Sequence, residues 1–384
     1  MMDGLEIRVV TSLSVQEAIE WDALCSTSPR GTVFSGSRWL RTAGRSDGIN
    51  QMCFMAYQGN RLLGGLTADI MSITVPDQYN VQGILEGNGI VQGLGARTLS
   101  AVLMPSIVAV TRAGHTCDIR VAQGLGEGTD DVLRALTRSL IDYGNSNGAV
   151  SAALLYLPSN AAFGRVFEPL GFKKGLVGAC AYLPVTFATF SEYLAGFSSK
   201  RRNAIKREIK AAHDAGVTYK RARLHQAIDR HVELARFTFE KYGPPFDADG
   251  YRRRMRIIAD VFGEDAYIIE MYVADRLVGS ALSLFEKQVL ATRAIGVHPG
   301  IPKRISAYFN LAFYETVKLG LDVHAQIVDY GFDLYETKVS RGCKLELQEL
   351  LLSTDDDSVA DRLSEVTNVT SSNVKHWNRR MVSP

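Results

Sequence analysis

Apolar and polar positions follow two different periods along the first half of the chain, and each period predicts one type of element. Alternating or continuous apolar residues predict strands, whereas apolar residues three and four positions apart predict helices. In one such helical stretch Leu133, Leu136, Leu140 and Ile141 share a face. The predicted strands are 5–10, 51–58, 61–73 and 149–158, and the predicted helices are 15–25, 32–44, 129–148 and 160–172.

Cap and turn residues mark where several of these elements begin and end. Ser14 is expected to cap the first helix, because a serine oxygen accepts a hydrogen bond from the helix start. Gly59 followed by Asn60 lies between two apolar stretches and predicts a hairpin turn. Trp39 is expected to face inward from the second helix. The glycine-rich stretch 78–100 has no clear period, and we expect a long loop there.

The second half repeats this order of elements with little repetition of individual residues. Each half has two helices, an antiparallel hairpin, a further helix and a strand, which indicates a duplicated topology. The hairpin of the second half is expected to turn at 274–276. The predicted helices are 198–216, 226–241, 248–262 and 305–320, and the predicted strands are 217–222, two within the hairpin 266–286, 289–297 and 325–331.

The chain is long enough for two domains of ordinary size. At 384 residues it exceeds what one typical hydrophobic core supports. We expect an N-terminal domain at 1–188, a C-terminal domain at 189–352, and a C-terminal segment at 353–384 made of an acidic turn, a short helix and a mobile tail. The fold class is mixed α/β (α+β), in which each domain has a mixed, mostly antiparallel sheet flanked by helices.

Composition and charge describe an ordinary globular protein. Hydrophobic residues make up 46% of the chain and charged residues 22%, which excludes an intrinsically disordered protein. The net charge of +2 gives no overall sign of nucleic-acid binding, so electrostatic arguments rest on local clusters. Five scattered cysteines favour reduced thiols in a cytosol. The sequence has neither a signal-peptide pattern nor an uninterrupted apolar span, and we expect a cytoplasmic protein without a membrane span.

Two clusters of basic residues are candidates for contacting nucleic-acid phosphates. Arg202, Lys206 and Lys210 recur every four residues and therefore form a basic ridge on one side of their helix. Arg252 and Arg253 belong to a second cluster on a later helix. The alternative for both clusters is a solvated helix surface, because most charged stretches of helices simply face water.

The stretch "DYGFDLYETKVSRGCKLE" carries the strongest local signal for chemistry. It begins with Asp329 and Gly331 at the end of a predicted strand and continues with Tyr335, Lys338 and Arg341, three positions apart. A lysine held in a dry cleft can stabilise negative charge that develops on an oxygen atom. The alternative is an ordinary surface lysine beside a glutamate.

This stretch and the order of the elements resemble the FemABX family of aminoacyltransferases. The family signature is Asp, an apolar or aromatic residue, Gly, a short gap, Leu-Tyr, two residues, Lys and a later glycine. In this chain the matching residues are Asp329, Tyr330, Gly331, Leu334, Tyr335, Lys338 and Gly342. The basic helix and "FSGSRWL" also resemble parts of this family, so the resemblance spans most of the chain. The aromatic residue that usually precedes the lysine is here Thr337.

The resemblance implies two tandem GNAT-like domains, the second of them catalytic, and transfer of an amino acid from aminoacyl-tRNA to an amine. The acceptor would be a small molecule of a natural-product pathway or a peptidoglycan precursor. Lys338 would act in catalysis with Tyr335 and Asp329, and Tyr335 would pack or guide the amine. Arg341 would contact a phosphate or pair with Asp329 or Asp333. The residues expected to bind substrate are Arg341, Gly331, Arg304, Asn310 and Tyr242, and those expected to bind tRNA are Arg202, Lys206, Lys210, Arg252 and Arg253.

Two other functions stay open at this point. An acyl-CoA-dependent GNAT N-acyltransferase would use a glycine-rich loop to cradle the pyrophosphate at the start of the central helix. Here Arg304 is followed by Ile305, Ser306, Ala307 and Tyr308, with no glycine. The other possibility is a non-catalytic RNA-binding or scaffold protein of degenerate GNAT fold. We expect no cofactor and no metal, because the seven histidines lack ligand spacing, and the sequence leaves the oligomeric state open.

Overall fold

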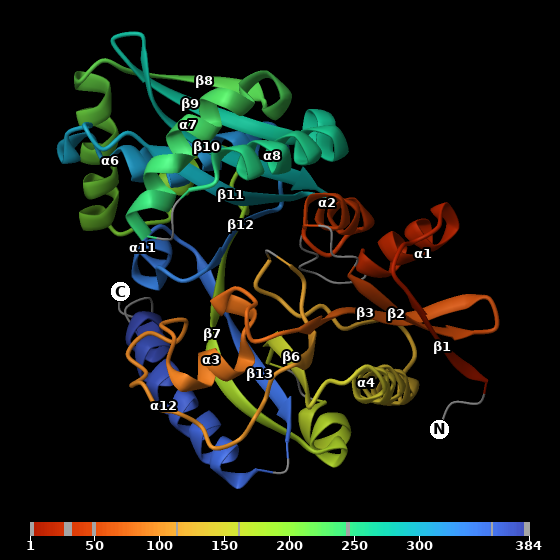
Figure 1. Cartoon of the computed structure of the whole chain (residues 1–384). Helices are drawn as coiled ribbons and strands as arrows, with labels where there is room; N and C mark the ends of the chain where they lie inside the picture. Colours follow the sequence, from red (N-terminus) through yellow and green to blue (C-terminus); the bar gives the residue numbers. More distant parts are fainter. Residues whose placement is uncertain are drawn as a thin grey trace.

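The strands of the computed structural model join both halves of the chain into one sheet (Figure 1). The structure describes residues 4–26, 33–47, 51–112, 114–159, 162–242, 246–354 and 356–379. The strands of the first half are β1 (Leu5–Val10), β2 (Met52–Gln58), β3 (Arg61–Met71), β4 (Ser106–Ala109), β5 (Arg120–Val121), β6 (Ser151–Pro158) and β7 (Phe172–Pro184). Those of the second half are β8 (Val217–Arg223), β9 (Ala266–Val273), β10 (Arg276–Glu286), β11 (Val289–Val297), β12 (Ile327–Phe332) and β13 (Lys344–Ser353).

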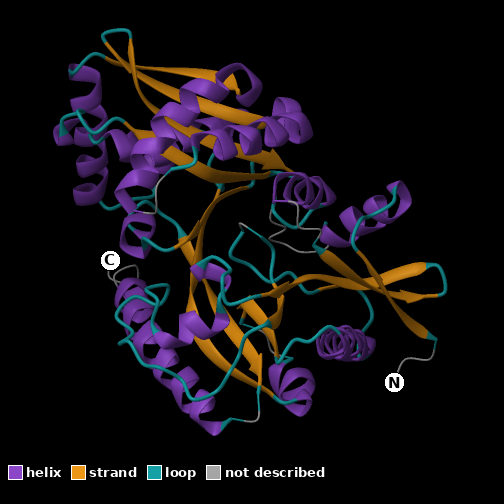
Figure 2. Cartoon of the chain, in the orientation of Figure 1, coloured by secondary structure: helices purple, strands orange, loops and turns teal. Residues whose placement is uncertain are grey.

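Helices pack on the faces of this sheet (Figure 2). The first half contributes α1 (Val15–Cys25), α2 (Ser37–Asp47), α3 (Val81–Glu86) and α4 (Gly128–Ser146). The helices that follow are α5 (Phe190–Ala195), α6 (Ser199–Asp214), α7 (Leu224–Tyr242), α8 (Ala248–Phe262), α9 (Ala307–Phe309), α10 (Thr316–Asp322), α11 (Tyr335–Val339) and α12 (Asp357–Arg379). A π-helical turn, Asn310–Glu315, joins α9 to α10.

Local sequence signals account for most of these elements. The predicted cap at Ser14 is confirmed, since its hydroxyl accepts from Glu17 N and Glu17 reaches back to Ser14 N. The hairpin signal at Gly59 is also confirmed, and Gly59 has a φ of +59°. In the second half the turn between β9 and β10 places Ala274 and Asp275 at positive φ, as hairpin turns require.

Three expectations about elements are wrong. The stretch 78–100 is not one loop, because Asn80 caps the short helix α3 through Gly83 N. The strands β4, β5, β7 and β13 were not expected. The C-terminal segment carries a long helix instead of a short one. Its apolar residues recur every three or four positions and are buried, and they are Val359, Leu363, Val366 and Val374.

The sheet order shows how the two halves interlock. The order is β1-β2-β3-β4-β6-β13-β7-β12-β11-β10-β9-β8, and β5 pairs with β3. β13 comes from the end of the chain yet lies between β6 and β7 of the first half, where it is antiparallel to both. β7 in turn pairs with β12 of the second half. The expected division between residues 188 and 189 stays a prediction. In the structure β13, which follows this division, pairs with β6 and β7, which precede it, and β7 also pairs with β12.

The sheet opens in the second half, and this opening positions the site. β11 and β12 run parallel, but they pair only between Val289–Ala291 and Ile327–Asp329. Thr292 Oγ1 still donates to Asp329 O at 2.9 Å. The ladder between the two strands ends there, so the last residues of β12 continue without β11 as a partner.

An apolar interface holds the two halves together beside this opening. Trp39 of α2 is buried in the hydrophobic cluster that α7, α8 and the sheet of the second half form. Its indole Nε1 donates to Arg112 O at 2.7 Å, and its ring lies 6.4 Å from that of Phe262. The inward orientation predicted for Trp39 is confirmed, and this residue joins the two halves.

Candidate active site

Lys338 is a buried cation at the end of β12. It lies on the short helix α11 and is only 5% exposed, so the alternative of a surface lysine is wrong. Its Nζ donates to Gly331 O at 3.0 Å and to Phe332 O at 2.6 Å. An ammonium group has three donors, so one remains for a further acceptor. Burial lowers the pKa of Lys338, while nearby Asp329 and Asp333 act in the opposite direction.

The backbone between β12 and α11 turns sharply so that two carbonyl groups face this ammonium group. Gly331, Asp333 and Leu334 all have positive φ, at +64°, +65° and +52°. Asp329 Oδ1 accepts a hydrogen bond from Gly331 N at 2.8 Å. The side chain of Asp329 therefore shapes the turn, and its buried charge lies near Lys338. A non-glycine residue at positive φ is strained, and such strain often occurs at functional sites.

Tyr335 anchors α11 to the first half of the chain. Its phenol oxygen accepts from Ala179 N of β7 at 2.9 Å, and its ring packs against Phe332. A Cβ atom at Gly178 would lie 2.0 Å from the Phe332 ring and 2.7 Å from the Tyr335 oxygen, so only glycine fits there. This geometry matches the packing role expected for Tyr335.

The side chain of Arg341 reaches toward α6. Its guanidinium group pairs with Glu208 at 3.0 Å and stacks on the Phe309 ring at 3.7 Å. It is also buried and donates to Thr337 O. The expected pairing with Asp329 or Asp333 is therefore wrong. The reason is that Glu208, which interrupts the positive residues of α6, turns inward and also accepts from the Tyr314 hydroxyl.

Two of the other residues expected to bind substrate, Asn310 and Arg304, lie at the start of the central helix. Asn310 is buried, and its amide donates to Ile305 O, Ser306 O and Glu208 O, so it ties this helix start to α6. Arg304 is exposed on the turn before the helix. Tyr242 ends α7, and its side chain lies outside the described residues. The structure thus brings Asn310 and Arg341 together at Glu208, and it places Lys338, Asp329 and Gly331 in a separate cluster.

The basic ridge lies on α6, which contacts the helix that carries Lys338. Arg201 Nε donates to Ser340 O at 2.7 Å, directly after α11. Lys206 and Lys210 are exposed, although Lys210 pairs with Asp214, and Arg202 is partly buried with bonds to Ala195 O and Ser199 Oγ. On α8 Arg253 is exposed, whereas Arg252 pairs with Asp229 and Asp249.

Sequence reasoning missed an aromatic wall beside Lys338. His115, Tyr156 and Phe332 contact one another with ring centroids 5.2 to 5.4 Å apart. The first two come from the first half and Phe332 comes from β12. In the sequence, the histidines were candidates only for metal ligation. The one available signal was the turn-like position of His115 after a buried strand.

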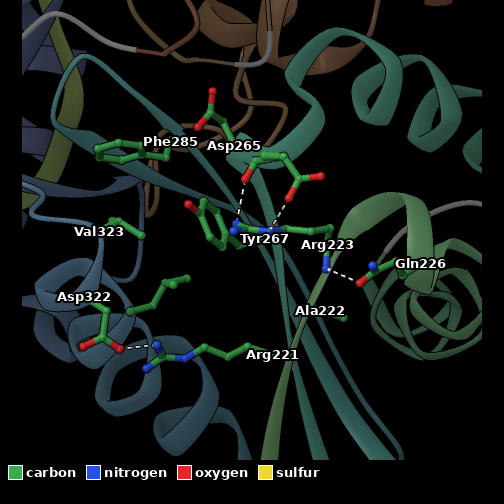
Figure 3. A pocket seen from close by; sticks show the side chains of 11 residues that line it. Arg221, Ala222, Arg223, Gln226, Asp265, Tyr267, Phe285, Asp322 and Val323 are labelled. Carbon is green, nitrogen blue, oxygen red and sulfur yellow. Dashed lines mark hydrogen bonds and ion pairs between the residues drawn. The ribbon is translucent and has the colours of Figure 1, made fainter.

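A pocket among the described residues lies at the other end of the strands of the second half (Figure 3). Its volume is about 600 Å³, and it lies where β8 ends and β12 is about to begin, whereas Lys338 follows the end of β12. Its two arginines are already paired, Arg221 with Asp322 and Arg223 with Glu264. Because both guanidinium groups are neutralised, this pocket is a weaker candidate for binding an anionic substrate.

Two classes of feature are absent from the described ranges. No group of three or more histidine, cysteine, aspartate or glutamate side chains in these ranges is arranged to hold a metal ion. None of the described helices combines the length and the apolar character that crossing a membrane requires.

Comparison with known proteins gives one family and a set of similar folds. A model of the FemAB-like family, described as acting in peptidoglycan biosynthesis and recognition, matches residues 118–381. The crystal structure of FemX is similar at a TM-score of 0.60 with 12% identity, covering 90% of this chain and 96% of that one. A tandem GNAT protein from the clavulanic acid biosynthesis pathway has a TM-score of 0.52 and 11% identity, covering 91% and 98%.

A conserved protein of unknown function from Bacteroides thetaiotaomicron is also similar. Its TM-score is 0.52 at 12% identity, and the match covers 90% of this chain and 99% of that one. No curated protein matches the sequence. At these identities the solved structures show the fold alone, which is that of tandem GNAT-like proteins.

Proposed function

Because this chain belongs to the FemAB-like family, we propose that it is an aminoacyltransferase that uses aminoacyl-tRNA as the donor. Family and fold support an acyltransferase. The proposed reaction joins the amino acid to an amine of a small molecule or of a peptidoglycan precursor. The proposed reaction needs no cofactor. It would take place in the cytoplasm, where charged tRNA is available.

The observation that carries this proposal is the buried Lys338 ammonium group. In aminoacyl transfer an amine attacks an ester carbonyl, and negative charge develops on the carbonyl oxygen. A cation that is already oriented stabilises this charge without reorganising, and its effect is large in a site that excludes water. Gly331 O and Phe332 O hold the Lys338 ammonium group in such a fixed orientation, with one donor left for the developing oxyanion.

The position of α6 supports a tRNA donor. Lys206 and Arg207 are exposed on this helix, so they are accessible to phosphates. On its inner side Arg201 bonds to Ser340, and Glu208 pairs with Arg341. The helix that would bind the tRNA backbone is therefore joined to the segment that carries Lys338. A donor bound along α6 could place its ester near the Lys338 ammonium group.

The start of the central helix supports the same donor. The helix begins at Ala307, and the preceding Ser306 has a φ of +52° without making a side-chain cap. On the central helix, Phe313 stacks on Tyr330 at 4.8 Å and Phe309 stacks on Arg341. Bulky side chains therefore fill space around this helix start, where a CoA pyrophosphate and its arm would need access to the backbone.

We therefore expect no binding of acetyl-CoA at ordinary cofactor concentrations. Isothermal titration calorimetry of the purified protein with acetyl-CoA should give no measurable heat of binding. A low-micromolar dissociation constant would contradict the tRNA donor and favour an acyl-CoA-dependent N-acyltransferase.

The direct test is a search for the product. The protein is incubated with total charged tRNA and a panel of candidate amines, and new amides are detected by mass spectrometry. Transfer that ribonuclease pretreatment abolishes supports the proposal. Transfer that survives ribonuclease but needs an acyl-CoA contradicts it. Binding of RNA without transfer from any donor would indicate a non-catalytic RNA-binding protein.

A further inference from the structure

His115 lies in the wall beside Lys338, in a strained and fixed conformation. Its φ is +46°, and Tyr156, whose ring it contacts, has a φ of +62° in the middle of β6. Neither residue is a glycine, and for a bulky tyrosine this conformation is a genuine outlier. Together with Asp333 and Leu334, four such residues converge at the end of β12. This concentration of strain points to a functional site.

The loop that carries His115 is held on both sides. Thr111 N donates to Thr116 O at 2.7 Å, and Cys117 N donates to Tyr156 O at 2.8 Å. Cys180 Sγ donates to His115 O at 3.3 Å, which fixes the backbone of His115 against β7. The imidazole ring stacks on Phe332 at 5.4 Å, and Phe332 O accepts from Lys338 Nζ at 2.6 Å. His115 and Lys338 therefore contact the same residue from different halves of the chain.

The imidazole nitrogens of His115 have no hydrogen-bond partner among the described residues, although the residue is partly buried. Four groups surround it: Tyr156 of β6, Cys180 of β7, Arg293 of β11 and Lys338 of α11. Burial and the two cations lower the pKa of His115 to about 4. At neutral pH the ring is therefore uncharged and has a free lone pair for a proton.

We infer that His115 is a catalytic residue that accepts the proton of the attacking amine. This inference rests on the aminoacyltransferase proposed above. The amine lone pair attacks the ester carbonyl carbon, a C–N bond forms, and the oxygen takes up negative charge beside Lys338. His115 removes a proton from the nitrogen, the C–O bond to the ribose breaks, and the imidazolium returns the proton to the ribose oxygen. An amide and a free hydroxyl result, and His115 is neutral again.

The same charges couple the two residues during the reaction. In the resting protein the Lys338 and Arg293 cations disfavour a protonated His115. As negative charge develops beside Lys338, it offsets these cations, and the imidazole becomes a stronger base. Proton acceptance is thereby favoured at the stage when the nitrogen needs to lose its proton. The first half of the chain supplies the base, and the second half supplies the charge stabiliser.

The test uses substitutions that tolerate positive φ, so that strain does not confuse the result. His115→Asn suits this purpose because asparagine is enriched in the left-handed region. The matched control is His324→Asn, since His324 is exposed and has a φ of +55°. Single-turnover transfer is measured with the charged tRNA and the amine that react with the wild type. We expect His115→Asn to be slower by roughly 10²- to 10⁴-fold, with unchanged tRNA affinity and melting temperature.

Two further measurements separate a base from a structural residue. Added imidazole should restore part of the activity of His115→Gly but none of that of Lys338→Met. The pKa of His115, followed by NMR, should rise in Lys338→Met, because a neighbouring cation is removed. An activity of His115→Asn within threefold of wild type, or no rescue by imidazole, would overturn the inference. If the wild type itself transfers nothing from any charged tRNA, the proposed function fails and the role of His115 fails with it.

Discussion

At the scale of single residues, the site depends on how one lysine is held. The two carbonyls that bind Lys338 belong to a turn in which Asp329 bonds to Gly331 N and three of four successive residues have positive φ. Most buried lysines lose part of their positive charge through desolvation. Burial lowers the pKa of Lys338 too, but the carboxylates of Asp329 and Asp333 oppose this shift, and the two carbonyl groups accept hydrogen bonds from the ammonium group. The turn thus holds a cation in a buried site.

Replacing Lys338 by methionine should remove catalysis and leave most of the fold intact. Methionine keeps much of the length and the apolar stem but lacks the charge. We expect single-turnover transfer to fall by roughly 10²- to 10³-fold, as when one fixed charge stabiliser is lost. The two carbonyls lose their donor, so stability should fall by about 1–3 kcal/mol. Binding of tRNA should change little, since one buried cation contributes few phosphate contacts.

The control for this variant is Lys344→Met, since Lys344 is an exposed lysine a few residues further along the chain. It should retain both the transfer rate and the stability of the wild type. Near-normal transfer by a folded Lys338→Met protein would show that Lys338 serves only to brace the turn.

The sequence predicted Lys338 through a family signature, but it did not predict the residues around it. Lys338 and Gly331 are seven positions apart, so their proximity follows from a local turn. Glu208 and Arg341 are 133 positions apart, and nothing in either local sequence indicates that they pair. His115 lies even further from Lys338 along the chain. Contacts of this kind depend on how the halves pack, which local patterns do not specify.

At the scale of elements, α6 connects the surface to the site. The helical period places Ile205 and Ala212 on one face, and both are buried. The same spacing places Lys206 and Lys210 on the opposite, exposed side. Periodicity therefore predicted the faces of this helix well. It could not predict that Arg201 would reach Ser340, because that bond depends on where α11 lies.

Reversing the charge of the basic ridge should weaken tRNA binding in a salt-dependent way. In the variant Arg202, Lys206 and Lys210 are all replaced by glutamate. Each lost phosphate contact lowers the slope of log affinity against log salt by about 0.7 to 0.9. Up to three contacts should therefore be lost, and affinities at several salt concentrations measure the slope.

A matched variant carries the same change of charge elsewhere, at Arg41, Arg61 and Arg138, which are exposed on the first half. This variant should keep the slope of the wild type. Equal slopes in the wild type and the ridge variant would mean that the ridge is a solvated helix surface.

At the scale of the whole molecule, the two halves exchange strands and share one interface. The pattern of apolar and polar residues predicted the same order of elements in both halves, and the structure confirms this order. The position of β13 between β6 and β7 could not be predicted, because an apolar strand pattern does not identify its partners. The candidate active site is also built from both halves, because His115 belongs to the first half and Lys338 to the second. The stability of the interface therefore bears on the function.

The interface contains a carboxyl group whose protonation should change with pH near neutrality. Glu286 ends β10, and its side chain is 10% exposed and 3.8 Å from Arg38 of α2. Burial raises the pKa of Glu286 from 4.5 to about 7, while Arg38 opposes the shift and Asp22 adds to it. The folded pKa is higher than the unfolded pKa, so the folded state binds the proton more tightly. This contribution to stability is complete below pH 4.5 and is lost as the pH rises through 7.

We expect Glu286→Gln to be less sensitive to pH than the wild type, because the amide resembles the protonated acid and does not ionise. A shift of this size corresponds to about 2.5 kcal/mol between pH 5 and pH 8. Urea unfolding midpoints at both pH values measure it, and the variant should be the more stable protein at pH 8. Glu168→Gln, at an exposed position, is the control and should follow the wild type. An equal loss of stability in Glu286→Gln and the wild type would show that Glu286 is already ionised at pH 5.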